Sequence, residues 1–372
     1  MNKNIYRTMK QKRLIIFIPS IEGGGVEKNL FIISNYLKDK INNISIITVS
    51  KKFRNKFNKK IKFISPKANF WDTIGRRKKF FVGLFLLFLE ILKNRNILVF
   101  CFQGNVYCTL LCKLLGIKII VRSNSAPDGW SQNKFKHLVF KYVFRNADKI
   151  IVNSLDFKKK FKSKFNIHTE CIYNPLNKKE IIGKSKIKNK IKFDKKKLNL
   201  INVGRYTDQK DQITLLKAVN LIKNKVNFNL LIVGRGIEKE NLQDYIKKNN
   251  LSNQVQLIDY QPNPFNLIKS SDIFCLTSLY EGLPNVLLET QVLKRFIISS
   301  NCPTGPREIL LDGKAGFLFN IKDYKKLSEL IIYYSKNKKL LSKKIDFGYK
   351  NLKRFDFKQN LKNYFEIINS LI

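Results

Sequence analysis

This chain of 372 residues has few histidines and few acidic residues, and its cysteines do not have the spacing of a metal-binding motif. It has two histidines, and its 27 acidic residues face 72 lysines and arginines, which gives a formal net charge of +45. The six cysteines lie mostly in apolar runs and form no Cys-x-x-Cys pair; they are residues 101, 108, 112, 171, 275 and 302. No structural zinc or other metal site is therefore expected. The cysteines fit buried thiols in a reducing cytoplasm, and Cys108 with Cys112, one helical turn apart, is the only hint of a pair.

Long apolar segments are also missing. Residues 1–12 are basic and the apolar stretch 14–19 is only strand-length, so neither a secretory signal nor a spanning helix is predicted. Residues 80–92 form an apolar run that holds a single acid, Glu90, and is too short to cross a bilayer. The basic residues 76–79 precede it. This run fits either a crossover helix buried against a sheet or a helix that lies in the interface of an anionic membrane.

The excess of positive charge has three explanations. It fits an anionic membrane surface or a nucleic acid as partner, and it also fits a genome whose base composition favours lysine, asparagine, isoleucine and phenylalanine codons. Only 13 of the 72 basic residues are arginines, whereas a reader of nucleic acid uses arginine for bidentate contacts. We therefore expect a cytoplasmic protein that is peripheral on the inner face of the cytoplasmic membrane and has no nucleic-acid partner.

Short apolar runs alternate with helical patterns along the chain, which predicts a doubly wound α/β architecture. The expected strands are residues 14–19, 44–49, 97–102, 117–121 and 149–153, then 200–203, 228–233, 255–258, 273–276 and 296–299. The lysine-rich segment 184–197 is the best linker candidate. We predict domains at residues 1–180 and 181–352, and a final amphipathic helix within 353–372.

The segment from Tyr280 to Glu289 carries the strongest chemical signal. Glu281 follows the expected strand 273–276, Gly282 and Pro284 break the chain, and a helix is expected from Asn285. Ligands of open α/β sheets bind at the carboxyl ends of the strands, and two carboxylates there suit the hydroxyls of a sugar and a ribose. Alternatively, Glu281 could stabilise the helix start through its dipole and Glu289 could simply be solvated.

Three further loops follow expected strands. Gly23, Gly24 and Gly25 form a tight turn before a helix, which fits either a phosphate site or close packing. The loop after residues 200–203 holds Gly204, Arg205 and Lys210, and both of its cations could reach one diphosphate. Alternatively, this loop is simply a solvated surface. The third loop, residues 302–310, holds another Gly-Pro turn at the same edge.

Five motifs in this order resemble the retaining, nucleotide-sugar-dependent glycosyltransferases of family 4, which have the GT-B fold. They are the glycine-rich first loop, Val-Gly-Arg-x-x-x-Gln-Lys at 203–210, Leu-Ile-Val-Gly-x-Gly at 231–236, Glu-Gly-Leu-Pro-Asn-Val-x-x-Glu at 281–289 and Gly-Pro-Arg-Glu-Ile-Leu at 305–310. The resemblance covers residues 14–319. It implies two Rossmann-like domains, the first on the acceptor side and the second holding the nucleotide sugar, with the C-terminal helix returning to the first.

The resemblance also implies roles for individual residues. Arg205 and Lys210 would bind the donor diphosphate and stabilise it as leaving group. Glu281 would contact the donor sugar and Glu289 the ribose, so that Glu281, Arg205 and Lys210 form the catalytic set. The loop at Gly23–Gly25 would close over the diphosphate. The full donor-binding set is Gly23, Gly24, Gly25, Gly204, Arg205, Lys210, Gly234, Tyr260, Glu281, Gly282, Leu283, Asn285, Val286 and Glu289.

The implied reaction moves a hexosyl unit from a UDP or GDP sugar to a saccharide acceptor, expected to be lipid-linked or at the cell surface. Cations at the departing diphosphate replace a metal, and front-face attack is expected because no motif supplies a nucleophilic carboxylate.

Near residue 121 many family members have a histidine beside the sugar, and here Asn124 or Asp128 is expected to fill part of that role. Asp259 stands where glycine is usual, and residues 294–296 replace a common Gly-x-Pro. The alternatives are a sugar-nucleotide epimerase and a non-enzymatic basic protein that binds membranes or nucleic acid.

Overall fold

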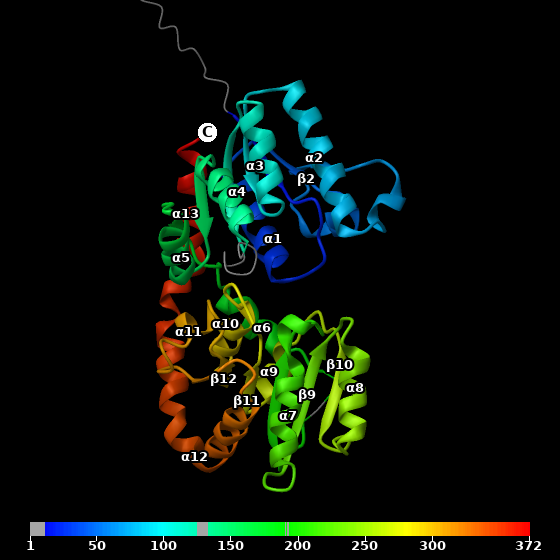
Figure 1. Ribbon diagram of the computed structural model, residues 1–372, viewed down its shortest axis with the longest axis vertical. Helices are drawn as coiled ribbons and strands as arrows, with labels where there is room; N and C mark the ends of the chain where they lie inside the picture. Colours follow the sequence, from blue (N-terminus) through cyan, green and yellow to red (C-terminus); the bar gives the residue numbers. More distant parts are fainter. Residues whose placement is uncertain (1–11, 125–132, 190, 192) are drawn as a thin grey trace, which may run out of the picture. The chain divides into compact units, whose positions relative to one another are not determined.

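The chain forms two compact units in the computed structural model, which describes residues 12–124, 133–189, 191 and 193–372. Unit 1 comprises Met1–Asn153, Lys158–Ile172 and Lys358–Ile372, and unit 2 comprises Ser154–Phe157 and Tyr173–Phe357. The basic residues 1–11 and Asp128 lie outside the described residues. Each unit has its own sheet and helices (Figure 1).

Unit 1 is built on a seven-stranded parallel sheet in the order β3-β2-β1-β4-β5-β6-β7. Its strands are β1 Arg13–Phe17, β2 Ile44–Ile47, β3 Lys62–Ile64, β4 Ile97–Cys101, β5 Lys118–Ser123, β6 Lys149–Val152 and β7 Glu170–Cys171. Its helices are α1 Gly25–Lys38, α2 Arg76–Lys93, α3 Asn105–Leu114, α4 Lys134–Arg145, most of α5 Leu155–Phe165 and most of α13 Phe357–Asn369, with 3-10 turns η1 Lys51–Lys56 and η2 Asn69–Asp72. The predicted C-terminal helix thus belongs to unit 1.

Unit 2 is built on a six-stranded parallel sheet in the order β10-β9-β8-β11-β12-β13. Its strands are β8 Leu198–Val203, β9 Phe228–Gly234, β10 Val255–Asp259, β11 Ile273–Leu276, β12 Phe296–Ser300 and β13 Phe317–Phe319. Its helices are α6 Lys178–Ser185, α7 Gln212–Ile222, α8 Lys239–Lys248, α9 Phe265–Ser270, α10 Asn285–Val292, α11 Pro306–Ile309 and α12 Tyr324–Lys350, with 3-10 turns η4 Asp208–Lys210 and η5 Asn351–Phe355.

Both faces of the unit 2 sheet are covered, because successive strand residues enter different cores. Leu200 packs in a cluster with residues of α7, α8 and α12, whereas its neighbour Ile201 packs in a cluster with residues of α6, α9 and α10. Parallel strands buried on both faces read as continuous apolar runs rather than alternating ones. The predicted doubly wound α/β fold is confirmed.

The ten predicted strands are all present, and three short ones were missed. β3, β7 and β13 have only two or three residues and lie at sheet edges, where a strand pairs with one neighbour. Such segments carry too few apolar residues to show a period. The lysine-rich segment 184–197, predicted as a linker, lies within unit 2.

The six cysteines are free thiols, as expected, and five of them are buried. Cys108 and Cys112 form no disulfide. Burial raises the pKa of the Cys108 thiol well above its ordinary value, so that this side chain stays protonated. Cys108 therefore behaves as a small apolar side chain within unit 1.

The apolar run 80–92 forms most of α2, which connects β3 with β4 as a crossover helix. One face of α2 is buried, including Gly83, Leu87 and Ile91. The buried-helix interpretation is thus correct for this face. Among the described residues, no helix combines the length and the apolar content needed to span a bilayer.

Gly234 ends β9 where the chain passes very close to the loop after β8. A Cβ at Gly234 would lie 1.8 Å from the carbonyl oxygen of Gly204, which is a backbone atom and cannot swing away. We expect Gly234→Ala to lower the free energy of unfolding by about 2–3 kcal/mol, as for overpacked cores. Urea unfolding checks this.

Gly183 provides the matched control for that substitution. It lies in α6 and a Cβ there meets nothing within 4 Å. Gly183→Ala should stabilise the protein by about 0.5–1 kcal/mol through helix propensity. Equal unfolding midpoints for the two variants would contradict the proposed close approach.

Candidate active site

The predicted cationic and acidic loops meet at the carboxyl edge of the unit 2 sheet. β8 pairs with β11, and β11 pairs with β12, so the loops after these three strands are neighbours. They carry Lys210, Glu281 and Thr304 respectively. The edge of an open α/β sheet at which the carboxyl ends gather is where such folds bind ligands.

Lys210 and Glu281 form a largely buried ion pair at this edge. The Lys210 Nζ lies 2.5 Å from the Glu281 Oε1, and the side chains are only 15% and 8% exposed. The Ser278 hydroxyl donates to the same carboxylate oxygen at 2.7 Å. Glu281 is thus held by a cation and a hydroxyl.

The backbone of the Glu281 loop is braced by β12 and the turn after it. Thr304 Oγ1 donates to the Glu281 carbonyl at 2.5 Å and Ser300 Oγ to the Ser278 carbonyl at 2.7 Å. Gly305 has φ +88°, and a Cβ there would lie 2.1 Å from the Gly282 carbonyl oxygen. The Gly-Pro turn after β12 therefore positions Glu281 through close backbone packing.

Cys302 lies in the same turn, and its thiol is not a nucleophile. Burial, with the Glu281 charge as a second cause, raises the pKa of its thiol to about 12. The thiol stays protonated at neutral pH, so Cys302 has no thiolate with which to attack a substrate.

The loop after β8 is fastened to the Glu281 loop at several points. Thr277 Oγ1 donates to the Lys210 carbonyl at 2.9 Å, and Gln209 Nε2 donates to the Tyr280 carbonyl at 2.9 Å. The backbone carbonyl of Arg205 accepts from Gln212 Nε2 at 2.9 Å. These bonds fix the path of both loops.

Arg205 differs from Lys210 in having an uncommitted charge. It is exposed, and within the described residues its guanidinium makes no hydrogen bond or ion pair. The charge of Lys210, by contrast, is balanced by Glu281. The side chain of Arg205 is therefore available to an anionic ligand.

A tightly packed corner lies at the ends of β9 and β10. The fully buried Tyr206 hydroxyl lies 2.8 Å from the Ile232 carbonyl and 2.7 Å from the Ile258 carbonyl. Burial raises the pKa of this phenol, so that it stays a donor. The half-exposed ring of Tyr260 lies 4.9 Å from the Arg235 guanidinium. Gly234 and Tyr260, predicted to hold the base, thus border one corner of the edge.

The helix α10 carries the second glutamate. Glu289 is 7% exposed, so the interpretation of Glu289 as a solvated helix residue is wrong. At the start of α10, the Asn285 Oδ1 accepts from Asn174 Nδ2 at 2.7 Å, and the Leu283 carbonyl accepts from the same amide at 3.4 Å. Gly282 and Val286 are half-buried beside them. Asn174 belongs to unit 2 and supports the Glu281 loop.

The predicted residues of the other domain lie in unit 1. Gly23 has φ +86°, and the backbone N–H of Gly24 donates to the Glu27 carboxylate at 3.0 Å, which caps α1. That Gly23, Gly24 and Gly25 close over a diphosphate stays a prediction. The Asn124 amide donates to the Phe102 carbonyl at 2.9 Å and its oxygen accepts from the buried Arg122, so the amide is used within unit 1.

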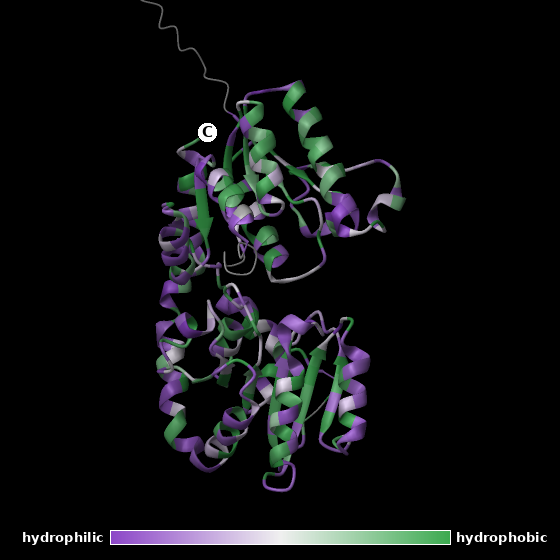
Figure 2. Ribbon diagram, viewed as in Figure 1, coloured by the Kyte–Doolittle hydropathy of each residue, from purple (hydrophilic) through white to green (hydrophobic). Residues whose placement is uncertain are grey.

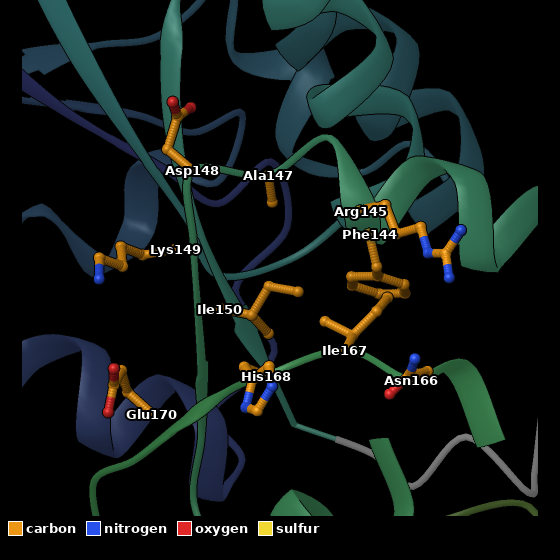
Figure 3. A pocket seen from close by; sticks show the side chains of 10 residues that line it. All are labelled: Phe144, Arg145, Ala147, Asp148, Lys149, Ile150, Asn166, Ile167, His168 and Glu170. Atoms are coloured by element: carbon orange, nitrogen blue, oxygen red, sulfur yellow. The ribbon is translucent and has the colours of Figure 1, made fainter. Parts of the chain in front are cut away.

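A shallow cavity of about 300 Å³ in unit 1 lies elsewhere (Figure 3). It is bordered by Lys149 and Glu170, the first residues of β6 and β7, so it opens at the amino ends of these strands. His168 and Asp148 are also in its lining. The predicted site residues lie at carboxyl ends, and the cavity includes none of them.

Several residues of the site were not predicted from the sequence. Ser278, Ser300 and Thr304 bond to Glu281 or its loop, and Arg235 lies against Tyr260. Serine and threonine are common in loops and carry no spacing signal. In the described part of the chain, no group of three or more His, Cys, Asp or Glu residues is arranged to hold a metal ion.

A family model matches the part of the chain that carries this edge. The family model of the glycosyl transferases group 1 matches residues 183–351, which include β8 to β12 and the Lys210–Glu281 pair. Residues 183–351 belong to the glycosyl transferases group 1 family. The site described above is therefore the carboxyl edge of a group 1 glycosyl transferase sheet, and the predicted resemblance is confirmed at this level.

Curated relatives of this chain are glycosyltransferases. An uncharacterized glycosyltransferase of Methanocaldococcus jannaschii, MJ1059, is 37% identical over 180 residues, which cover 46% of this chain and 44% of that protein. A Campylobacter jejuni GalNAc-alpha-(1->4)-GalNAc-alpha-(1->3)-diNAcBac-PP-undecaprenol alpha-1,4-N-acetyl-D-galactosaminyltransferase is 25% identical over 84% of this chain and 85% of its own. The chain spans about half the length of most curated relatives it matches.

Solved structures confirm the GT-B fold of this chain. The structure of Anabaena Alr3699/HepE in complex with UDP-glucose matches with a TM-score of 0.77 and 14% identity, covering 96% of this chain and 100% of that one. Sucrose-phosphate synthase from Thermosynechococcus elongatus matches with a TM-score of 0.79. The two parallel sheets with helices on their faces are thus the two Rossmann-like domains that were predicted.

Proposed function

We propose that this protein is a metal-independent, retaining glycosyltransferase that moves a hexosyl unit from a UDP or GDP sugar to a saccharide acceptor. The single observation that carries the proposal is the edge of the unit 2 sheet, where the uncommitted charge of Arg205 lies on the same loop as the Lys210–Glu281 pair. That edge falls within the glycosyl transferases group 1 match. Cations there suit a diphosphate, and carboxylates suit hydroxyl groups.

The mechanism follows from where charge develops. The bond between the sugar C1 and the diphosphate oxygen breaks, leaving negative charge on the diphosphate and oxocarbenium character on the sugar. Arg205 and Lys210 stabilise the departing diphosphate more than the bound donor, which lowers the barrier. The acceptor oxygen attacks C1 on the same face, and its proton passes to the leaving phosphate oxygen.

The two glutamates have separate roles in this proposal. Glu281 accepts from hydroxyls of the donor sugar while its other contacts, from Lys210 and Ser278, hold the carboxylate in place. Glu289 accepts from the ribose, and Gly234 with Tyr260 borders the base. Leu283, Asn285 and Val286 shape the start of α10 between the two carboxylates.

A lipid-linked acceptor is the second part of the proposal. The Campylobacter jejuni relative is named as an N-acetylgalactosaminyltransferase of a saccharide on PP-undecaprenol. The formal charge of +45 suits an enzyme that meets such acceptors at an anionic membrane surface. We accordingly propose a peripheral enzyme on the cytoplasmic face of the membrane.

Calorimetric titration with UDP and GDP tests the donor site. One of the two should bind, and binding should be the same in EDTA as in Mg²⁺, because protein cations rather than a metal hold the diphosphate. A basic protein without a donor site would bind a DNA duplex in a salt-sensitive way and neither nucleotide. Loss of UDP and GDP binding in EDTA would contradict metal independence.

A further inference from the structure

The outer face of α2 is apolar where a surface helix is normally polar. Phe81 is 70% exposed, Phe85 59% and Leu92 59%. They are spaced four and seven residues apart, which places them on one side of the helix. Exposed apolar patches on this scale mark surfaces that contact another molecule or a membrane.

Two charged residues of α2 lie on its inner side. Lys79 is buried and its Nζ donates to the Asp72 carbonyl at 2.8 Å. Glu90 is buried between Arg13 at 2.7 Å and Lys93 at 2.8 Å. The usual arrangement, with charge outside and apolar side chains inside, is therefore partly inverted in this helix.

Packing on the inner side fixes this orientation. A Cβ at Gly83 would lie 2.7 Å from the Pro19 Cβ, so α2 lies directly on the chain after β1. A rotation that buried Phe81 and Phe85 would bring larger residues against Pro19. Gly83, Leu87 and Ile91 thus lie on the inner side of α2, and Phe81 and Phe85 lie on the outer side.

The neighbouring helices extend the apolar surface. α3 packs against both α2 and α4, and Figure 2 shows α2 and α3 as largely hydrophobic. The exposed apolar residues of α3 and α4 are Tyr107, Leu110, Leu114, Leu138 and Tyr142. We call these residues with Phe81, Phe85 and Leu92 the α2–α4 face.

The charges on α2, α3 and α4 themselves are almost all positive. The only acidic residue in the sequences of α2, α3 and α4 is Glu90, which is buried and paired. Exposed cations border the face; they are Arg77, Lys78, Lys134, Lys136 and Arg145. Two copies of such a face would repel each other, whereas an anionic lipid surface would attract it.

We propose that the α2–α4 face docks unit 1 on an anionic lipid bilayer, with its apolar side chains in the acyl boundary and its cations on the headgroups. This is the arrangement of an interfacial helix that combines apolar burial with attraction to anionic lipids. The inference deepens the proposed function, because it names the surface through which the enzyme reaches a lipid-linked acceptor. The biological role of the docking rests on the proposed function. Binding of the face to a bilayer does not, because it needs neither donor nor acceptor.

Vesicle sedimentation tests this inference with the full chain. Wild-type protein should bind vesicles of phosphatidylcholine with phosphatidylglycerol more tightly than vesicles of phosphatidylcholine alone. The triple variant Phe81→Ser, Phe85→Ser and Leu114→Ser should bind the anionic vesicles at least about tenfold more weakly, because three apolar side chains no longer leave water. The matched control changes three exposed apolar residues of unit 2, Leu221→Ser, Leu340→Ser and Phe347→Ser, and should bind as the wild type does.

Each other outcome overturns the inference. If the wild-type protein does not bind anionic vesicles, it has no docking face. If the triple variant and the control lose vesicle binding equally, the α2–α4 face is not the surface that binds. Sedimentation equilibrium that shows a wild-type dimer, lost only in the triple variant, would assign the face to a second copy. Because the vesicles contain no acceptor, a protein that binds UDP or GDP without binding vesicles refutes this inference alone.

Discussion

Arg205→Ala should lower kcat about 10²–10³-fold, which is the usual cost of removing one group that stabilises charge in a transition state. The reason is the asymmetry between the two cations of the loop after β8. The Lys210 charge is balanced by Glu281, whereas Arg205 is exposed and makes no ion pair within the described residues. Arg205 therefore supplies most of the uncompensated positive charge for the departing diphosphate.

The controls separate this role from loss of structure. Arg205 is on the surface, so the Arg205→Ala protein should unfold at the wild-type urea concentration. Arg205→Lys should recover part of the rate, since it restores a charge without the planar fork. Arg95→Ala removes an exposed arginine of unit 1 and should leave the rate unchanged. Wild-type turnover in Arg205→Ala would remove Arg205 from the mechanism.

Lys210→Met should cost about 3 kcal/mol of folding free energy as well as activity. It would leave the Glu281 carboxylate, 8% exposed, without its cation, and breaking one side of a buried pair typically costs about 3–5 kcal/mol. Glu281→Gln should also lower the free energy of unfolding, because it leaves the Lys210 ammonium without its carboxylate. The double variant should lose less than the sum of the single losses, because neither charge is then left buried alone.

A double-mutant cycle in urea measures this coupling. The control is the surface pair of Lys326 and Glu329, whose side chains are 52% and 63% exposed at 3.0 Å. Its coupling should be no more than about 0.5 kcal/mol. Additive losses at Lys210 and Glu281 would show that the two side chains do not depend on each other.

Much of the fold could be predicted because short apolar runs are a local signal. Leu14 to Phe17 and Leu198 to Ile201 are buried on both sides of their strands, and such runs read directly from the sequence. The order of strands is not local. β8 lies between β9 and β11, and this order brings Lys210 next to Glu281, which is 71 residues further along the chain. The spacing of the two residues in the sequence does not predict this contact.

The site was predicted at the level of loops and missed at the level of contacts. Glu281 and Lys210 were expected at one edge, but the ion pair between them and the hydroxyl of Ser278 depend on side-chain geometry. The inverted arrangement of α2 was hidden for a similar reason. Residues 80–92 are apolar nearly all round, so the side that faces out depends on tertiary contacts such as the close approach of Gly83 to Pro19.

Release of nucleoside diphosphate from a panel of nucleotide sugars tests the central claim most directly. The protein is incubated with each UDP and GDP sugar, with and without a polyprenyl-diphosphate saccharide, and the freed nucleotide is quantified. We predict release from one donor, faster with the acceptor, and nearly abolished in Arg205→Ala. Folded wild-type protein that releases no nucleotide from any donor, or an Arg205→Ala protein that releases it at the wild-type rate, would contradict the account.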